Sequence, residues 1–183
     1  IYVVSPQNTI YNNKKIPVNL TANMEVDEIA YTDYLEKKPK EKELCDGCNE
    51  YGNSKKKTLN LKDGQHNITF SASNNGNSTF KRKNFFIDSR EPKIKKTLPK
   101  KNGYRNGSFI IEYEEPNQKQ INLHYGDQIN AKTDCPFNSL EKRQICNFNV
   151  NLAPFDRQNI NYWFKIEDIA GNKDESKPIE VHI

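Results

Sequence analysis

The sequence predicts an all-β chain that folds as two antiparallel β-sandwich domains in series. Short runs of alternating apolar and polar residues recur along the 183 residues, Gly and Asn turn signals separate them, and the second half repeats the pattern of the first. One sandwich needs about 100 residues, so the length suits two small domains. Helical periodicity is almost absent, and residues 34–43 are expected to form a loop.

Strand-like alternation and turn signals follow one another in a regular order. The expected strands are Ile1–Val4, Ile16–Ala22, Glu28–Tyr34, Thr58–Leu61, Asn67–Ala72, Asn84–Asp88, Ser108–Tyr113, Ile121–Tyr125, Cys146–Leu152, Ile160–Glu167 and Ile179–Ile183. Turn signals between them include Lys62-Asp63-Gly64, Asn75-Gly76, Asn106-Gly107 and Ala170-Gly171-Asn172. Short strands with such turns are typical of antiparallel sandwiches.

An internal repeat divides the chain. Residues 59–61, 68–72, 74–77 and 86–88 recur in pattern as residues 150–152, 162–166, 168–172 and 179–181. Pro92 prevents strand continuation after Ser89. We therefore expect one domain over residues 1–89 and a second over residues 90–183.

Several motifs resemble a known family. They are Ser5-Pro6-Gln7-Asn8-Thr9-Ile10-Tyr11 with Ile16-Pro17-Val18-Asn19-Leu20-Thr21, Leu61-Lys62-Asp63-Gly64-Gln65-His66, and Asp168-Ile169-Ala170-Gly171-Asn172. These stretches resemble the immunoglobulin-like repeats of bacterial and archaeal cell-surface proteins, including surface-layer proteins. The resemblance implies two tandem immunoglobulin-like domains with an extracellular, structural role. It is weak over residues 99–146, and the first copy has Asn74 where the family usually has Asp.

Composition argues against nucleic-acid and membrane-spanning functions. Lys and Arg number 13 against 11 acidic residues up to Ser89, and 15 against 13 from Arg90 onward, so neither half is strongly charged. The clusters Lys55-Lys56-Lys57 and Lys81-Arg82-Lys83 are expected to be solvated surface, since no nucleic-acid-binding motif accompanies them. No apolar run approaches the roughly 18 residues of a membrane span. A start at Ile1 without a leader favours a processed or excised piece of a longer protein.

Four cysteines are expected to form disulfides in an oxidising compartment. Cys45 and Cys48 share a Cys-x-x-Cys motif, and Cys135 and Cys146 lie 11 positions apart. The simplest pairing is within each domain, and each bond would stabilise its short loop by about 1–3 kcal/mol. A zinc site and a thiol-redox centre are the alternatives, but the motif lacks converging ligands and a βαβ context.

Four Asn-x-Ser/Thr sequons, at Asn19, Asn67, Asn77 and Asn106, are candidate glycosylation sites. Period-two alternation places Asn19 and Asn67 opposite the apolar face of their strands, and Asn77 and Asn106 fall at turns. All four are therefore expected on the surface. Chance occurrence in an Asn-rich chain is the alternative.

Trp163 is a candidate contact residue because its strand neighbours Tyr162 and Phe164 share the inward face. An outward Trp is expected to pack under a loop or a neighbouring domain. It could instead form a sugar-binding platform with Tyr104, Tyr113 or Tyr125.

No catalytic residue, cofactor site or metal site is predicted. His66, His124 and His182 are scattered, with His66 expected in a turn and none near a nucleophile motif. The acidic pairs Asp27-Glu28 and Glu114-Glu115 could bind calcium, but a solvated pair is favoured because ligand spacing is missing.

The sequence thus favours a non-enzymatic structural and adhesion module of a secreted or cell-surface protein, surface-layer-like and archaeal by its resemblance. Its partners would be other proteins or further copies of itself, with glycans as a further possibility. One alternative is a fibre subunit whose residues Ile1–Val4 complete the sheet of the next subunit. Another is a carbohydrate-binding accessory domain.

Overall fold

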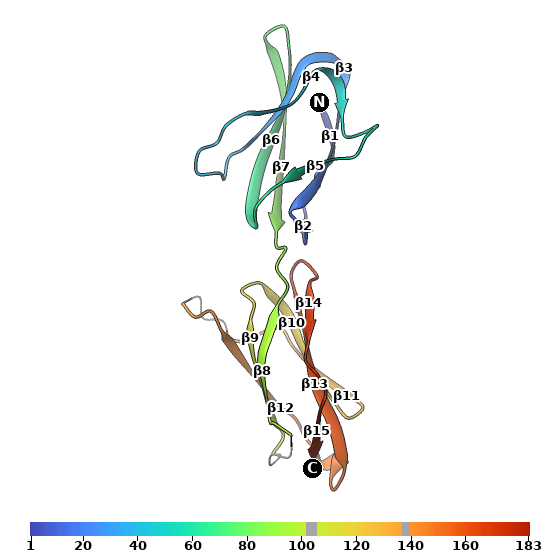
Figure 1. Cartoon of the computed structure of the whole chain (residues 1–183), viewed down its shortest axis with the longest axis vertical. Helices are drawn as coiled ribbons and strands as arrows, with labels where there is room; N and C mark the ends of the chain where they lie inside the picture. The colour runs from blue at the N-terminus through green and yellow to red at the C-terminus, as the bar shows by residue number, and fades with distance from the viewer. Residues whose placement is uncertain (102–105, 137–139) are drawn as a thin grey trace. The chain divides into compact units, whose positions relative to one another are not determined.

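The computed structural model describes residues 1–101, 106–136 and 140–183. The chain forms two compact units, Ile1–Ser89 (unit 1) and Arg90–Ile183 (unit 2). Both are built from β-strands, and the described ranges contain a single helical element, the short 3-10 turn Ala153–Phe155 (Figure 1). The predicted all-β, immunoglobulin-like class is confirmed by this architecture. No helix among the described residues is long and apolar enough to cross a bilayer.

Unit 1 consists of two layers that share one long strand. Its strands are β1 (Tyr2–Ser5), β2 (Ile10–Tyr11), β3 (Lys15–Asp33), β4 (Lys42–Tyr51), β5 (Lys57–Asn60), β6 (Gly64–Asn74) and β7 (Asn77–Ile87). The first half of β3 pairs with β1 and β5, the second half pairs with β6, and β4 pairs with residues of both halves. β7 pairs with β6, and β2 joins the end of β7 in parallel.

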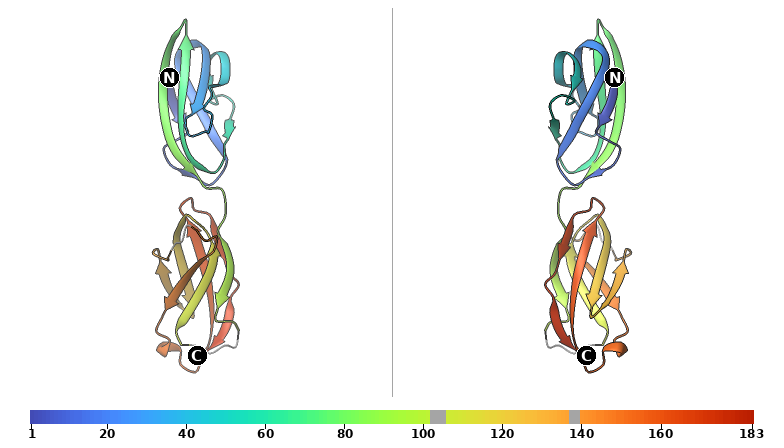
Figure 2. Two further views of the ribbon diagram at one scale, coloured as in Figure 1. Left: turned by 90° about the vertical axis from the view of Figure 1, so that its left-hand side faces the viewer. Right: turned by 90° about the vertical axis from the view of Figure 1, so that its right-hand side faces the viewer.

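Unit 2 contains two separate sheets. Its strands are β8 (Lys93–Leu98), β9 (Ser108–Glu114), β10 (Gln118–Tyr125), β11 (Gln128–Lys132), β12 (Gln144–Asn149), β13 (Asn159–Asp168), β14 (Lys173–Glu175) and β15 (Ile179–His182). One sheet has the order β12-β9-β8, and the other has the order β11-β10-β13-β14 with β15 also paired to β13. Figure 2 shows the strands of unit 2 from two opposite sides.

Alternate side chains from the facing layers form a separate core in each unit. In unit 1 the fully buried side chains include Ile16, Leu20, Ile29, Ile68, Phe70 and Ile87. In unit 2 they include Phe109, Ile111, Phe148, Tyr162, Phe164 and Ile166. Burial of one such side chain contributes about 1.5–3 kcal/mol, so these alternating positions dominate the stability of each sandwich.

The structure corrects two parts of the strand prediction. Ile16–Ala22 and Glu28–Tyr34 were expected as separate strands but form the single strand β3, because no Gly or Pro interrupts the residues between them. Five strands were not expected: β2, β4, β8, β11 and β14. Each of them lies at the edge of a sheet, where few side chains are buried and alternation is weak.

Candidate functional site

Asp168 ends β13 and organises the turn that follows. Its side chain is 0% exposed. Oδ1 accepts the backbone N–H groups of Ala170 at 2.8 Å and Asn172 at 2.9 Å, and Oδ2 accepts the side-chain amide of Asn172 at 2.7 Å. Gly171 adopts a φ of +85°, which a glycine tolerates without strain. This motif therefore acts as a structural turn in unit 2.

The corresponding turn of unit 1 uses different chemistry. Asn75 and Gly76 have φ values of 49° and 78°, as expected for a two-residue hairpin turn between β6 and β7. Asn74, which stands where unit 2 has Asp168, donates its amide to the carbonyl of Glu25 at 3.3 Å. Gly76 thus supplies one of the two positive φ angles that this hairpin turn requires.

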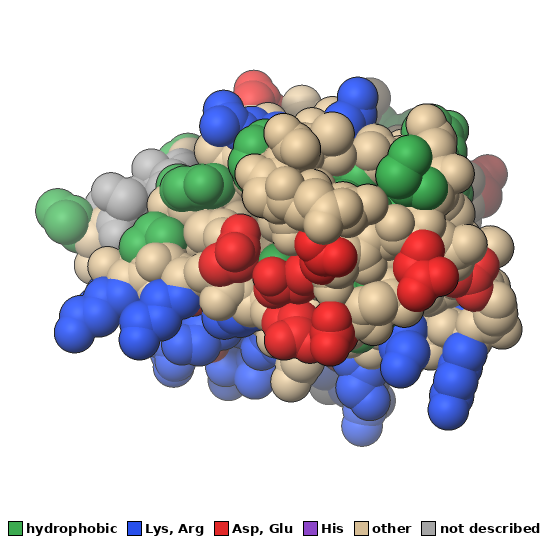
Figure 3. Space-filling view, turned by 90° about the horizontal axis from the view of Figure 1, so that it is seen from above, with side chains coloured by type: hydrophobic (Ala, Val, Ile, Leu, Met, Phe, Trp, Pro, Cys, Tyr) green, Lys and Arg blue, Asp and Glu red, His purple; other side chains and the backbone are tan. Residues whose placement is uncertain are grey.

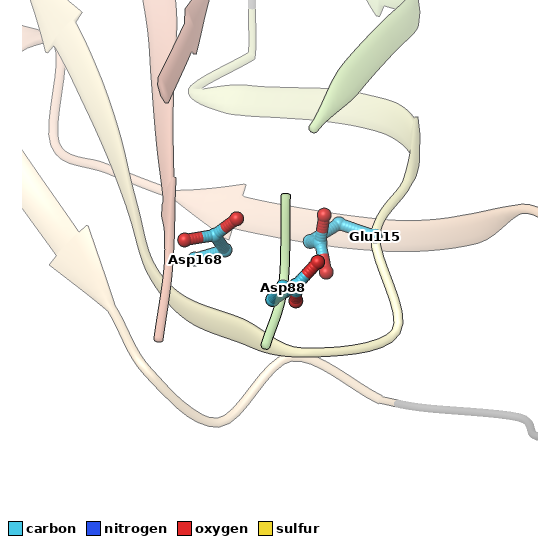
Figure 4. A group of neighbouring side chains, drawn as sticks. All are labelled: Asp88, Glu115 and Asp168. Carbon is cyan, nitrogen blue, oxygen red and sulfur yellow. The ribbon is translucent and has the colours of Figure 1, made fainter. Parts of the chain in front are cut away.

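Glu115 lies close to Asp168 within unit 2. It occupies the turn after β9, is 3% exposed and accepts the backbone N–H of Asn117 at 2.7 Å. Carboxylate oxygens of Glu115 and Asp168 approach within 4.8 Å (Figure 4). The prediction of a solvated Glu114-Glu115 pair is wrong for Glu115, because its side chain is buried and hydrogen-bonded to the backbone of Asn117.

Hydrogen-bond donors from their own turns stabilise these two buried carboxylates. Oxygen ligands of this kind suit Ca²⁺, but the oxygens of Asp168 are held by three turn donors. Backbone donors stabilise an ionised carboxylate and so permit its burial. The third side chain labelled in Figure 4, Asp88, follows β7 in unit 1 and is also buried.

Glu114 points to the opposite side of its strand and forms ion pairs. Its Oε2 lies 3.2 Å from Lys95 and 3.6 Å from Lys142. Partial burial alone would raise the pKa of Glu114, but the hydrogen bond from Lys95 and the charge of Lys142 outweigh it and hold the pKa below its usual value. In the other acidic pair considered, Asp27 is exposed and accepts the backbone N–H of Asn75.

All four cysteines are joined in disulfides. Cys45 is bonded to Cys48 within β4, and Cys135 is bonded to Cys146, which lies in β12. Gly47, with a φ of +54°, forms the bend between the first pair. Each bond lies within one unit, and neither leaves a thiolate for zinc binding or redox chemistry.

The four sequons differ in accessibility. Asn77 starts β7 and is exposed, and Asn106 is exposed in the approach to β9, where its Oδ1 accepts the N–H of Ser108. Asn19 in β3 and Asn67 in β6 are partly buried, and the Oδ1 atom of each is shielded from solvent. Asn77 and Asn106 are therefore more accessible than Asn19 and Asn67, whose side chains are only partly exposed.

Trp163 is partly buried on the outer face of β13. It pairs across the strands with His124 of β10, and the two rings stack at 4.6 Å with planes 9° apart. The Trp side chain is therefore packed on a cross-strand partner, which the sequence did not predict. Tyr113 and Tyr125 are buried in the core of unit 2 and cannot form a sugar platform. Tyr104 lies outside the described residues.

His66 forms a buried polar pair that sequence reasoning missed. It lies in β6 and not in a turn, with Nδ1 at 2.5 Å from Oδ2 of Asp33 and Nε2 at 2.8 Å from the carbonyl oxygen of Lys62. Its ring stacks on Phe85. Every second residue of a strand faces the same side, so the inward-facing Ile68 indicated that His66 also faces inward. Both nitrogens are occupied by acceptors, so this His–Asp pair does not activate a nucleophile.

The pair lies beside a cavity of about 700 Å³ in unit 1. Apolar lining comes from Tyr31, Leu35 and Leu61, and polar lining includes Lys37 and Lys38. Burial raises the pKa of the Tyr31 hydroxyl, against the lowering effect of nearby Lys42. His124 and His182 lie in unit 2 and do not contribute to this cavity.

No family model matches the chain, and no curated protein matches it in sequence. Among solved structures, it is similar to the fibronectin(III)-like modules of Clostridium thermocellum CbhA, with 12% identity and a TM-score of 0.47 over all of this chain and 93% of that one. Extracellular domains 3–5 of Drosophila OTK give 13% identity and a TM-score of 0.44 over all of this chain and 61% of that one.

A further similar structure is a tetra-tandem repeat from the extending region of a large adhesion protein. It gives 14% identity and a TM-score of 0.45 over all of this chain and 48% of that one. These similarities concern the tandem β-sandwich fold alone.

Proposed function

We propose that this chain is a non-enzymatic structural and adhesion module of a secreted or cell-surface protein. The disulfide bonding of all four cysteines carries this proposal, because such bonds persist in oxidising compartments and are rare in the cytosol. The polar groups that could have done chemistry serve the fold: Asp168 closes a turn, and His66 is paired with Asp33. The chain would then act by binding other molecules through its surfaces.

The finer role is as part of an envelope or surface-layer-like array, in an archaeal or bacterial protein. Support comes from the motif resemblance and from two exposed sequons, Asn77 and Asn106. Unit 1 and unit 2 would extend the protein and present edges or loops to protein partners. The fibre alternative, in which Ile1–Val4 leaves its own sheet, has less support because β1 pairs with β3 of the same unit.

Peptide mass spectrometry under non-reducing conditions, on protein from the native source, tests location and glycosylation together. We expect peptides linked through Cys45–Cys48 and Cys135–Cys146. We expect glycan mass on peptides that contain Asn77 and Asn106, and none on those with the shielded Asn19 and Asn67. Free thiols with four unmodified asparagines would refute an extracellular role.

A carbohydrate-binding role is the second candidate, supported by the stacked pair of Trp163 and His124 on an outer sheet face. Aromatic faces stack on sugar rings. Since Trp163 is the only tryptophan, its fluorescence reports directly on this site. Quenching by members of a broad glycan panel that is lost in His124→Ala would support this role. An unchanged spectrum across the panel would exclude it.

A further inference from the structure

The edge of β7 is open over most of its length. β2 covers this strand only at Phe86 and Ile87. The N–H groups of Asn84, Phe86 and Asp88 point away from β6, because they donate to Asn8, Thr9 and Tyr11. In an antiparallel ladder, the backbone N–H and C=O groups of successive residues point alternately toward and away from the neighbouring strand. The N–H and C=O groups of residues 78, 80 and 82 therefore face the open side.

This open segment is basic and carries an exposed aromatic side chain. Residues 77–87 include Lys81, Arg82 and Lys83 and no acid. None of the ion pairs among the described residues involves these three side chains. Phe80 is 64% exposed. Charges on an edge strand discourage pairing with strands of the same charge. A second β7 would therefore be repelled, whereas an acidic strand would be attracted.

β4 forms the opposite edge of the same layer and has the opposite charge. It pairs only with β3, and its residues 42–51 contain three acids and one lysine. That lysine, Lys42, is already bound to Glu36 at 2.8 Å. Asp46 lies directly across the pair from Glu28, an arrangement of like charges that destabilises an isolated sheet. A neighbouring cation would relieve this repulsion.

We infer that unit 1 binds a second copy of this chain, with the basic β7 edge of one molecule against the acidic β4 edge of the next. In Figure 3 several Asp and Glu side chains lie near the centre of the face seen from above, and most of the visible Lys and Arg side chains lie along its lower margin. Such a contact uses two different surfaces, so it repeats head to tail and builds an open filament, or a ring where the rotation between successive copies closes. The inference rests on the proposed structural role and specifies its partner.

Paired charge reversals test this contact by analytical ultracentrifugation of the whole 183-residue chain. The wild type should associate with increasing concentration at low ionic strength. It should dissociate in about 1 M salt, where the Debye length is about 3 Å. The triple variant K81E/R82E/K83E and the double variant E43K/D46K should each be monomeric, with association weakened about tenfold or more.

An equimolar mixture of the two variants is the decisive sample. Each variant alone has two edges of the same charge, whereas the mixture again offers a basic edge to an acidic one. Association should therefore return in the mixture, and this recovery also shows that both variants are folded. The triple variant K55E/K56E/K62E has the same change in net charge on exposed positions of unit 1 and should associate like the wild type.

A backbone variant separates strand pairing from charge attraction. Arg82→Pro removes an N–H that faces the open side and makes no bond to β6, whereas Arg82→Ala removes the same charge and keeps that N–H. Association should therefore fall further in Arg82→Pro than in Arg82→Ala, while the circular dichroism of the fold is kept in both. The contact is refuted if the wild type stays monomeric at high concentration. It is also refuted if the reversals leave association unchanged, or if the mixture stays monomeric. None of these results bears on disulfide or glycan state, which tests the proposed function separately.

Discussion

A single buried carboxylate can determine a whole turn when its hydrogen bonds remain within that turn. Asp168 does so in unit 2, where it accepts from two backbone N–H groups and one side-chain amide. Removal of such an acceptor leaves buried donors without partners, and this loss costs more than the bonds themselves contribute. Asp33 has a similar role in unit 1, where it accepts from His66 and from the backbone of Leu35.

Asp168→Ala should lower the free energy of unfolding of unit 2 by about 2–3 kcal/mol, because the donors of Ala170 and Asn172 lose their acceptor. Urea titration followed by Trp163 fluorescence measures this change, since the only tryptophan lies in unit 2. Glu180→Ala removes an exposed carboxylate of the same unit and should change stability by less than about 0.5 kcal/mol. Equal effects of the two substitutions would contradict the structural role of Asp168.

The phenol of Tyr113 should titrate abnormally. Burial, together with the charge of Glu115, raises the pKa of Tyr113 to about 12, and its hydroxyl donates to Gln118. The unfolded pKa is about 10, so the folded state holds this proton more tightly. Unit 2 should keep this stability below pH 10 and lose it as pH rises toward 12. Absorbance at 295 nm should show a late-titrating tyrosine that Tyr113→Phe lacks, whereas a single transition near pH 10 in folded protein would contradict the prediction.

Residue patterns predict burial better than they predict partners. Alternation placed Tyr162, Phe164 and Ile166 in the core and Trp163 on the outer face, as the structure has them. The same rule applied to His66 would have placed it inside with Ile68 and Phe70. That Asp33, 33 positions earlier, is its partner depends on the β3–β6 register, which no local pattern contains.

Strands that bury alternate side chains were predictable, and mostly polar edge strands were not. β6 and β13 each lie between two neighbours and have clear alternation. β4 and β11 lie at edges and are mostly polar. A polar edge strand resembles a loop in sequence, since one face and one row of backbone groups meet water. Tertiary pairing, and not intrinsic preference, makes these segments strands.

Gly107, at the entrance to β9, is expected to be essential for unit 2. Its φ is +84°, and an added Cβ would lie 2.3 Å from the carbonyl oxygen of Val150. Gly107→Ala should therefore destabilise unit 2 by about 2–4 kcal/mol, combining backbone strain with a steric clash. Gly171 is a matched control because its φ is +85° but its Cβ would meet open space.

Gly171→Ala should therefore lower the free energy of unfolding of unit 2 by only about 1 kcal/mol, because it adds backbone strain without a steric clash. Urea titrations of both variants, again followed through Trp163, give the comparison. If Gly107→Ala were no more harmful than Gly171→Ala, the close approach of β9 to Val150 would not exist in solution.

At the scale of the whole chain, each of the two units has its own hydrophobic core. The core of unit 1 contains residues from Val3 to Ile87, and the core of unit 2 contains residues from Phe109 to Val181. Each disulfide also closes within its own unit. The repeat in the sequence led us to expect two domains, because each copy supplies a complete set of alternating strands.

Fragments 1–89 and 90–183 should therefore each fold alone, because neither core needs a residue from the other. Differential scanning calorimetry of each fragment should give a cooperative transition, and the two should resemble the transitions of the intact chain. Asp168→Ala supplies the internal control, since it should lower only the transition of fragment 90–183 and the matching transition of the intact chain. A fragment 1–89 that stays unfolded, or an intact chain in which Asp168→Ala lowers both transitions equally, would show that the two units fold as one cooperative structure.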